Sequence, residues 1–358
     1  MPAYDAFLLV SFGGPEGRDD VMPFLENVTR GRGVPPERLA GVAEHYYAFG
    51  GVSPINQQCR DLLAAVRADM AGSGLSLPLY WGNRNWKPYL TDTVRAMAAD
   101  GVRRAVAFVT SAYSSNSGCR QYLDDIERAR AAVGPGAPEI DKIRRYYNHP
   151  GFIEPFAAAA DDALATLPAD RRDDAHLVFT AHSVPVAMAE ASGPGGAGGR
   201  GRYAAELTEA ARLVAERTSG GRHPWTFAYQ SRSGPPSQPW LEPDVCDHIG
   251  DLAKSGTRAV VVIPVGFVSD HMEVRHDLDV EAAQAAESVG VAFARAATPG
   301  AHPRFASMIT ELVRERMTGA SGAALGRLGV PSQECPVDCC RYAQPAAGRP
   351  VAEDRGRA

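Results

Sequence analysis

The sequence predicts an α/β protein of two similar Rossmann-like lobes, each with a parallel four-stranded sheet flanked by helices, and an active-site cleft between the lobes. Short apolar runs of strand type alternate with segments of helical periodicity, which is typical of parallel sheets covered on both faces. Four such runs lie in each half of the chain. Because ligands bind beyond the carboxyl ends of strands in open α/β sheets, we expect functional residues in the loops that follow the strands.

The strands are predicted from apolar runs that have the length and residue types of buried strands. In the first half these are residues 5–12, 77–83, 104–111 and 139–146. The second half repeats the arrangement at residues 175–181, 225–231, 259–268 and 290–296. Helical periodicity occupies residues 87–99, 151–166, 243–255 and 302–318. The halves share no sequence repeat, so the predicted duplication is one of architecture.

The boundary between the lobes is predicted at the polar segment LPADRRDD, residues 167–174. The first lobe is expected to span residues 1–166. The second is expected to span residues 167–318, and its last helix can pack on the first lobe. Residues 319–358 form a C-terminal tail that contains three of the six cysteines.

Composition restricts the class of protein. A chain of 358 residues with 45% hydrophobic and 22% charged residues can bury a large core. A net charge of −5 and a pI near 6.0 provide no basic face for a phosphate backbone, so we expect no nucleic-acid partner. The first residues lack the basic segment of a signal peptide, and no apolar stretch has the roughly 18 residues of a transmembrane helix. We expect a cytoplasmic protein, and a monomer.

Two of the predicted strands lead into histidine motifs. The stretch FTAHSVP places His182 where a buried strand gives way to a turn fixed by Pro185. Two strands later, VGFVSDHMEVRHDLDVEA places His271 and Glu273 at the equivalent point. Histidine with carboxylate suits Fe(II) and other borderline divalent metals, and the spacings do not match a structural zinc site. The alternative for His182 is a core histidine satisfied by a backbone carbonyl.

The second motif also contains a row of acids. Glu273, Asp277 and Glu281 fall at i, i+4 and i+8 of a regular helix. Each neighbouring pair of like charges then costs roughly 0.2 to 0.5 kcal/mol, so a functional reason is expected. The alternative is an ordinary solvated helix face.

Five motifs in this order resemble the ferrochelatase family, most of all its actinobacterial members that metallate coproporphyrin III. The motifs are NVTRGRG, FGGVSPIN, FTAHSVP, QSRSGPPSQPWLEPDV and VGFVSDHMEVRHDLD. The resemblance covers residues 4–318. It implies a lyase of haem biosynthesis with two Rossmann-like lobes, which inserts Fe²⁺ as substrate into a porphyrin and releases two pyrrole protons.

The resemblance also assigns the metal chemistry. It implies that His182 and Glu273 are the catalytic and metal-binding pair. His271, Asp277 and Glu281 would form a path for the metal or the protons, along a helix that contains a π-type turn in this family. Alternatives to coproporphyrin III as substrate are protoporphyrin IX, a cobalt or nickel chelatase, and a non-catalytic haem or iron-sulfur sensor.

Porphyrin binding is expected to need apolar walls and cations for the carboxylates. Arg30 and Arg32 lie on a glycine-flanked turn, where a guanidinium can meet a propionate; the alternative is ordinary surface placement. By resemblance, the porphyrin-binding set is Phe12, Arg30, Arg32, His45, Tyr46, Ser53, Tyr122 and Trp240. Two departures are Phe12, where Firmicute members have a tyrosine that ligates iron, and Gln230, where many relatives have a tryptophan.

The tail contains the motif ECPVDCCRY with Cys335, Cys339 and Cys340. Disulfides are not expected in the cytoplasm, and four thiolates can hold a [2Fe-2S] cluster. Many actinobacterial ferrochelatases have such a cluster at this tail, and the resemblance points to Cys119 as the fourth ligand. The alternatives are free thiols in a disordered tail or a zinc site. We also expect transient contact with other enzymes of the haem pathway.

Overall fold

The computed structural model describes residues 4–31, 33–194, 201–234 and 237–342. Its first sheet has the strand order β2-β1-β3-β4 and its second β6-β5-β7-β8, and all pairs are parallel. The two orders are equivalent, which confirms the predicted duplication and fold class. The strands are β1 (Ala6–Ser11), β2 (Leu79–Asn83), β3 (Arg104–Val109), β4 (Glu139–Lys142), β5 (His176–His182), β6 (Trp225–Gln230), β7 (Ala259–Ile263) and β8 (Ala292–Arg295).

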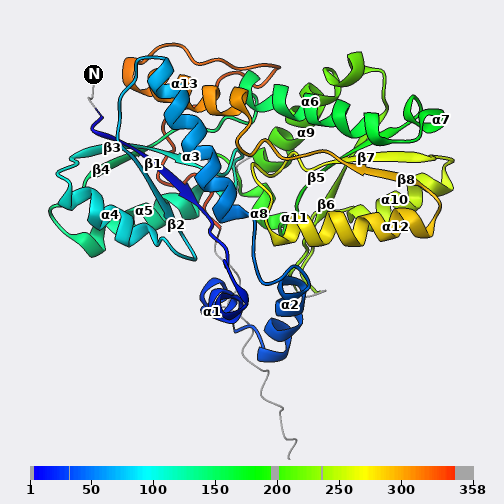
Figure 1. Cartoon of the computed structure of the whole chain (residues 1–358), viewed down its shortest axis with the longest axis horizontal. Helices are drawn as coiled ribbons and strands as arrows, with labels where there is room; N and C mark the ends of the chain where they lie inside the picture. Colours follow the sequence, from blue (N-terminus) through cyan, green and yellow to red (C-terminus); the bar gives the residue numbers. More distant parts are fainter. Residues whose placement is uncertain (1–3, 32, 195–200, 235–236, 343–358) are drawn as a thin grey trace, which may run out of the picture.

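Each predicted strand is present, but several end earlier than the apolar run. The strand predicted at 259–268 ends at Ile263, because Pro264 has no N–H to donate to a neighbouring strand. The strand predicted at 139–146 ends at Lys142. The central strands β1 and β7 are buried along their whole length, since helices cover both faces of each sheet (Figure 1).

Helices connect successive strands in each lobe. The first lobe contains α3 (Ile55–Gly72), α4 (Leu90–Ala99), the π-helical turn η1 (Asn116–Arg120) and α5 (Gln121–Val133). The second contains α7 (Ala169–Arg172), α8 (Val186–Glu190), α9 (Arg202–Ala215), the 3-10 turn η3 (Thr218–Gly221), α10 (Val245–Lys254), α11 (Met272–His276), the π-helical turn η4 (Asp277–Ala282) and α12 (Ala283–Ser288). In the described part of the chain, every helix is either too short or too polar to cross a lipid bilayer.

Two helices are exchanged between the lobes. Helix α6 (Pro150–Thr166) precedes the second sheet and packs against β7 and β8 of that sheet, while α13 (Pro303–Thr318) returns to pack on α3 and β3 (Figure 1). Both begin alike: His149 and His302 cap their helices by accepting a hydrogen bond on Nδ1 at 3.1 Å, and a proline follows each. Helix α6 therefore packs with the second lobe, although the predicted boundary between residues 166 and 167 assigns it to the first.

An arm of two helices, α1 (Arg18–Val28) and α2 (Pro36–Ala48), projects from the first lobe beneath both sheets (Figure 1). Its small core centres on Phe24, whose ring contacts Phe12, Tyr46 and Trp86 at centroid distances of 6.0 to 6.3 Å. The arm reaches the second lobe, because Arg38 donates a hydrogen bond to the Ser233 carbonyl at 2.6 Å.

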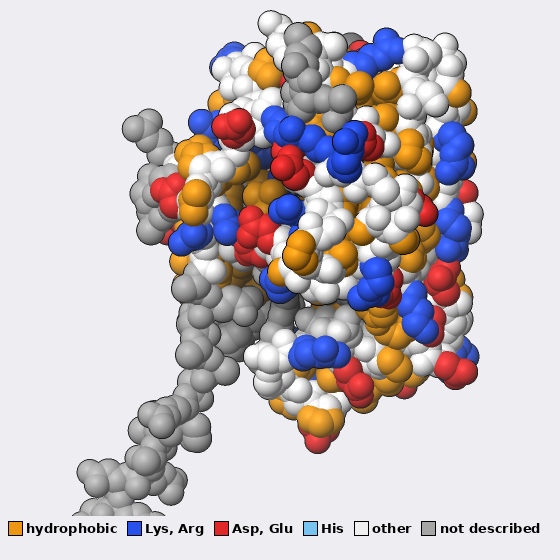
Figure 2. All heavy atoms as spheres, turned by 90° about the vertical axis from the view of Figure 1, so that its left-hand side faces the viewer, with side chains coloured by type: hydrophobic (Ala, Val, Ile, Leu, Met, Phe, Trp, Pro, Cys, Tyr) orange, Lys and Arg blue, Asp and Glu red, His pale blue; other side chains and the backbone are white. Residues whose placement is uncertain are grey.

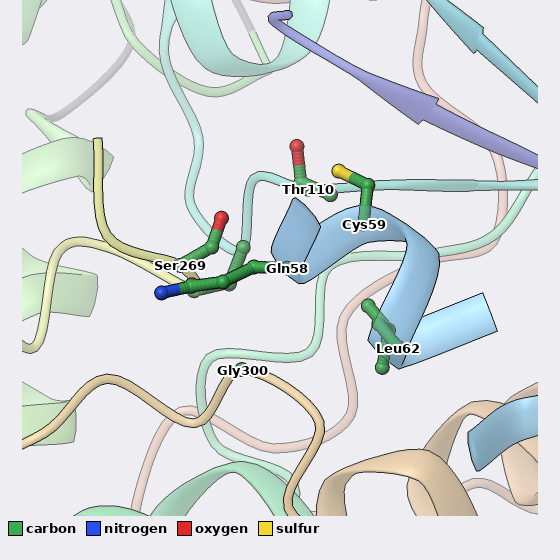
Figure 3. Close-up of a pocket in the computed structure, with 7 residues that line it drawn as sticks. Gln58, Cys59, Leu62, Thr110, Ser269 and Gly300 are labelled. Carbon is green, nitrogen blue, oxygen red and sulfur yellow. The ribbon is translucent and has the colours of Figure 1, made fainter. Parts of the chain in front are cut away.

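The lobes are in tight contact along α3. Gln58 extends from α3 toward the segment that contains Ser269 and accepts a hydrogen bond from the Asp270 N–H at 2.8 Å (Figure 3). The contact at this junction is too close to admit a water molecule. On the outer face drawn in Figure 2, Lys and Arg side chains alternate with Asp and Glu side chains, so charges of both signs are mixed there.

Candidate active site and cysteine cluster

The end of β5 and the segment after β7 bring a histidine and a carboxylate together. These strands pair in parallel, so their carboxyl ends meet. The chain after β7 crosses β5 closely: a Cβ at Gly266 would lie 2.4 Å from the Cβ of Ala181. As a result the Nε2 of His182 lies 3.6 Å from Oε2 of Glu273, and their side chains are 33% and 53% exposed. The pair can therefore be reached from solution.

The hydrogen bonds of His182 fix the role of each ring nitrogen. Its Nδ1 lies at the carbonyl of Ser183, which only accepts, so Nδ1 bears the hydrogen of the neutral ring. The Nε2 lone pair then faces Glu273. The backbone carbonyl of His182 accepts a bond of 2.8 Å from the Tyr203 hydroxyl. The Nδ1 of His182 is thus bound to a backbone carbonyl, as expected if His182 were an ordinary core histidine. The Nε2 remains available to accept a proton or to bind a metal ion.

His271 supports this pair from the helix start. It is the N-cap of α11, and its Nδ1 accepts a hydrogen bond from the Val274 N–H at 3.4 Å. Burial lowers the pKa of His271, with the charge of Glu273 acting in the opposite direction and that of His182 adding to the effect. His271 is therefore neutral at physiological pH and holds the first turn of the helix that positions Glu273.

The helix after Glu273 is not regular. The π-helical turn η4 begins at Asp277 and separates α11 from α12, so the three acids do not form one uniform stripe. Glu273 and Glu281 have side chains that are 53% and 52% exposed, whereas that of Asp277 is 16% exposed. The solvated-face alternative describes the outer two acids but not Asp277.

Asp277 is held by residues at the end of β6. Ser231, in the left-handed backbone region with φ of 62°, and Gln230, at 3.4 Å, both donate hydrogen bonds to its Oδ2. Burial raises the pKa of the Asp277 carboxyl to about 7 against these two bonds, and the charges of Glu273 and Glu281 add to the rise. This acid can therefore exchange a proton near neutral pH.

His276 completes a set of possible metal ligands that the sequence analysis did not select. Its Nδ1 lies 3.7 Å from Oδ1 of Asp277 and 3.8 Å from Oε1 of Glu281. Ligand atoms of the three residues all lie within 4.8 Å of one another. The ring of His45 on α2 stacks on His276 at 3.7 Å, so the arm contacts this helix directly.

The remaining candidates for porphyrin binding fall into groups. Tyr46 lies close enough to Glu273 for that charge to raise its pKa, an effect smaller than that of burial. Trp240 pairs with Pro185, close to His182. The other candidates lie in the first lobe. Arg30 lies just after α1 and is exposed, and Phe12 packs on the arm. Ser53 and Tyr122 are buried, with 3% and 4% of their surface exposed. Arg32 lies outside the described residues.

The four cysteines of the predicted cluster converge. Cys119, on η1, has its Sγ 3.9 Å from that of Cys335, and the Sγ atoms of Cys339 and Cys340 are 3.7 Å apart. The left-handed conformation of Cys340 (φ 56°) lets adjacent residues turn both sulfurs inward. The N–H of Gly193, in the second lobe, donates to the Cys340 Sγ at 3.2 Å. The set therefore joins both lobes to the tail.

The sulfurs share their protons. Hydrogen bonds from neighbouring thiols lower the pKa of Cys339 to about 3 and lower that of Cys119, whereas they raise the pKa of Cys335 and Cys340. The thiolate is the form that binds metal. Cys59 and Cys246 lie elsewhere, on α3 and α10.

Comparison with known proteins decides the family. The model of the ferrochelatase family matches residues 4–317. The chain belongs to the ferrochelatase family. A coproporphyrin III ferrochelatase from Streptomyces coelicolor is 55% identical over 359 residues, which covers 96% of each chain. A protein of the same name from Nocardia farcinica is 55% identical over 353 residues, covering 96% of this chain and 99% of its own.

Solved structures support the fold. SirB from Bacillus subtilis with Fe³⁺ has a TM-score of 0.53 with 11% identity, covering 88% of this chain and 97% of its own. In this ferrochelatase, the sequence motifs had indicated His182, Glu273 and the four cysteines as candidates, and the structure brings each set together. The motifs did not indicate that Gln230 and Ser231 donate hydrogen bonds to Asp277, because these bonds depend on the left-handed backbone conformation at Ser231.

Proposed function

We propose that this chain inserts Fe²⁺ into coproporphyrin III to give the iron coproporphyrin, a step of haem biosynthesis. The observation that carries the proposal is the approach of His182 Nε2 to Glu273 Oε2 at 3.6 Å, from two separate strand ends. Membership of the ferrochelatase family and the names of the two actinobacterial relatives support the reaction and the substrate.

The pair provides the two functions that metal insertion needs. The lone pair of His182 Nε2 can accept a pyrrole proton, and the carboxylate of Glu273 can hold the incoming Fe²⁺. For each porphyrin, one Fe²⁺ enters and two protons leave, so charge is conserved. His276, Asp277 and Glu281 would carry the hydrated ion toward this pair or carry protons away from it. The pKa of Asp277, about 7, suits the second task.

The porphyrin would lie between the arm and the second lobe. Trp240 would provide an apolar wall beside His182, and His45 and Tyr46 would approach from α2. The exposed Arg30 would meet a carboxylate of the substrate. Phe12 cannot ligate iron, so this ferrochelatase would hold its product through other contacts.

The test is a turnover assay with purified protein. Coproporphyrin III should be metallated by Fe²⁺ faster than protoporphyrin IX, and Co²⁺ or Ni²⁺ with sirohydrochlorin should give no product. We expect His182→Ala and Glu273→Gln to abolish insertion while porphyrin still binds, as followed by its absorption spectrum. Glu287→Gln, an exposed carboxamide substitution on α12, is the matched control and should retain activity. Full activity in both site variants would defeat the proposal.

We also propose that Cys119, Cys335, Cys339 and Cys340 bind a [2Fe-2S] cluster. Two thiolates on one tetrahedral metal with bonds near 2.3 Å lie about 3.8 Å apart, and the two close pairs, at 3.9 and 3.7 Å, fit this spacing. When bound, such a cluster can accept one electron. Arg145 lines the same cavity as Cys335 and Cys339, and its buried Nε has no hydrogen-bond partner among the described residues. Such a donor is expected beside a site that binds an anionic group.

Visible absorption with equal amounts of iron and acid-labile sulfide would identify the cluster. Cys335→Ser should lose it, and Cys246→Ser, on α10, should keep it. Zinc in place of iron and sulfide would refute the assignment. None of the six cysteines forms a disulfide, which agrees with the cytoplasmic location that we propose. A monomer with transient contacts to other haem-pathway enzymes completes the proposal.

A further inference from the structure

We propose that Arg145, which borders the cysteines, and Glu206, the buried carboxylate paired with it, set the reduction potential of the cluster in opposite directions. Arg145 raises the potential and Glu206 lowers it. The inference rests on the [2Fe-2S] cluster proposed above, and it concerns two residues that take no part in the ligand set.

Arg145 lies in the buried connection that follows β4, within the segment 139–146 that was predicted to be a strand. Its side chain is 8% exposed, and it borders a cavity of about 370 Å³ whose walls include Cys335 and Cys339. One terminal nitrogen, Nη1, donates to the hydroxyl of Ser114. The Nε is buried and has no hydrogen-bond partner among the described residues. The guanidinium therefore keeps one donor without a hydrogen bond, in a side chain that borders the same cavity as Cys335 and Cys339.

The adjacent Arg144 has different charged partners from those of Arg145. Its guanidinium faces the other way and forms a two-point ion pair with Glu315 of α13, at 2.7 and 2.9 Å. It also donates to the carbonyl of Ala323 at 2.9 Å. The Nε and Nη2 atoms of Arg144 thus meet α13 and Ala323, whereas Arg145 pairs with Glu206 of α9 and borders the cavity lined by Cys335 and Cys339.

Glu206 comes from α9 in the second lobe and is completely buried. Its Oε2 accepts the N–H of Ser114 at 2.7 Å and its Oε1 accepts the Ser114 hydroxyl at 2.9 Å. The same Oε1 lies 3.8 Å from Nε of Arg145. This distance makes an ion pair without a hydrogen bond.

The reduction potential of the cluster depends on the charges that lie near it. Reduction adds one negative charge to a cluster that four thiolates already make anionic. A cation close by favours that step and a carboxylate opposes it, and water screens both charges only weakly because the two side chains are 8% and 0% exposed. A hydrogen bond to a ligand sulfur acts in the same direction as the cation, and both are known determinants of cluster potentials.

The test is a redox titration of the full-length protein with its cluster, reduced by dithionite from [2Fe-2S]²⁺ to [2Fe-2S]⁺ with one electron per cluster. Arg145→Gln should lower the midpoint potential and Glu206→Gln should raise it. Arg145→Lys keeps the charge but removes the planar donor, so its potential should lie between those of the wild type and Arg145→Gln. Glu334→Gln removes an exposed carboxylate at the rim of the same cavity, and its shift should be smaller than that of Glu206→Gln.

A purely structural role would move both charge-removing variants in the same direction or change only the amount of cluster retained. Shifts of the same sign, or no shifts, would overturn the inference. If Arg145→Gln fails to retain a cluster, Arg145→Lys and Glu206→Gln decide: an unchanged potential in both refutes the proposal. A wild-type protein without iron and sulfide would instead refute the cluster itself, so the two failures can be distinguished.

Discussion

Asp277→Asn should make the protein more stable, and more so as the pH rises. The pKa of Asp277 rises from 3.8 to about 7 on folding, mainly through burial. The folded protein therefore retains a proton that the unfolded chain releases. The wild type loses the corresponding stability as the pH rises from about 4 to about 7, and the loss is complete above pH 7.

The magnitude follows from the two pKa values. At about 1.36 kcal/mol per pKa unit, the wild type should be about 4 kcal/mol less stable at pH 8 than a chain in which this group stays neutral. At pH 5 the difference falls to about 2 kcal/mol, and near pH 3 it should vanish. Asparagine approximates the neutral state, because its carbonyl oxygen can still accept the bonds from Ser231 and Gln230. The side chain is 16% exposed, so screening by water reduces these values only modestly.

Urea denaturation of both proteins at pH 3, 5 and 8, without added metal, measures the difference. Asp162→Asn removes an exposed carboxylate on α6 and serves as the control, with a change within about 0.5 kcal/mol at every pH. A gain for Asp277→Asn that is the same at all three pH values, or no gain, would refute the reasoning. The gain in stability should accompany slower iron insertion, as expected where a site tolerates an unfavourable buried charge for its function.

Two further predictions concern packing. Gly266→Ala should lower stability by about 1 to 3 kcal/mol and reduce iron insertion, because the new Cβ would meet Ala181 at 2.4 Å and displace the segment that leads to Glu273. Thermal unfolding with a turnover assay checks this, and wild-type values in both would contradict it. Glu315→Gln should cost about 3 to 5 kcal/mol by leaving the buried Arg144 without its countercharge. In this variant, limited proteolysis should cleave the C-terminal tail before it cleaves the lobes. A tail that is cleaved at the same rate as in the wild type would count against this role of the ion pair.

The sequence alone determined the features that depend on local pattern. Apolar runs identified each strand, and the motifs at strand ends indicated His182 and Glu273 as candidates, because parallel pairing brings the carboxyl ends of neighbouring strands to one edge. Resemblance to ferrochelatases added Cys119 to the cysteines of the tail. These inferences required the identity and spacing of residues along the chain, and no distances between segments.

The tertiary structure decided which elements pack together and which charges are buried. The packing of α6 on the second sheet cannot be read from periodicity, since its apolar face would suit either sheet. Asp277 differs from Glu273 and Glu281 only because η4 and the turn at Ser231 enclose it. Arg144 and Arg145 are adjacent and chemically identical, yet one pairs with α13 and the other with α9, because burial and long-range contacts, rather than residue type, determine the charge that each one meets.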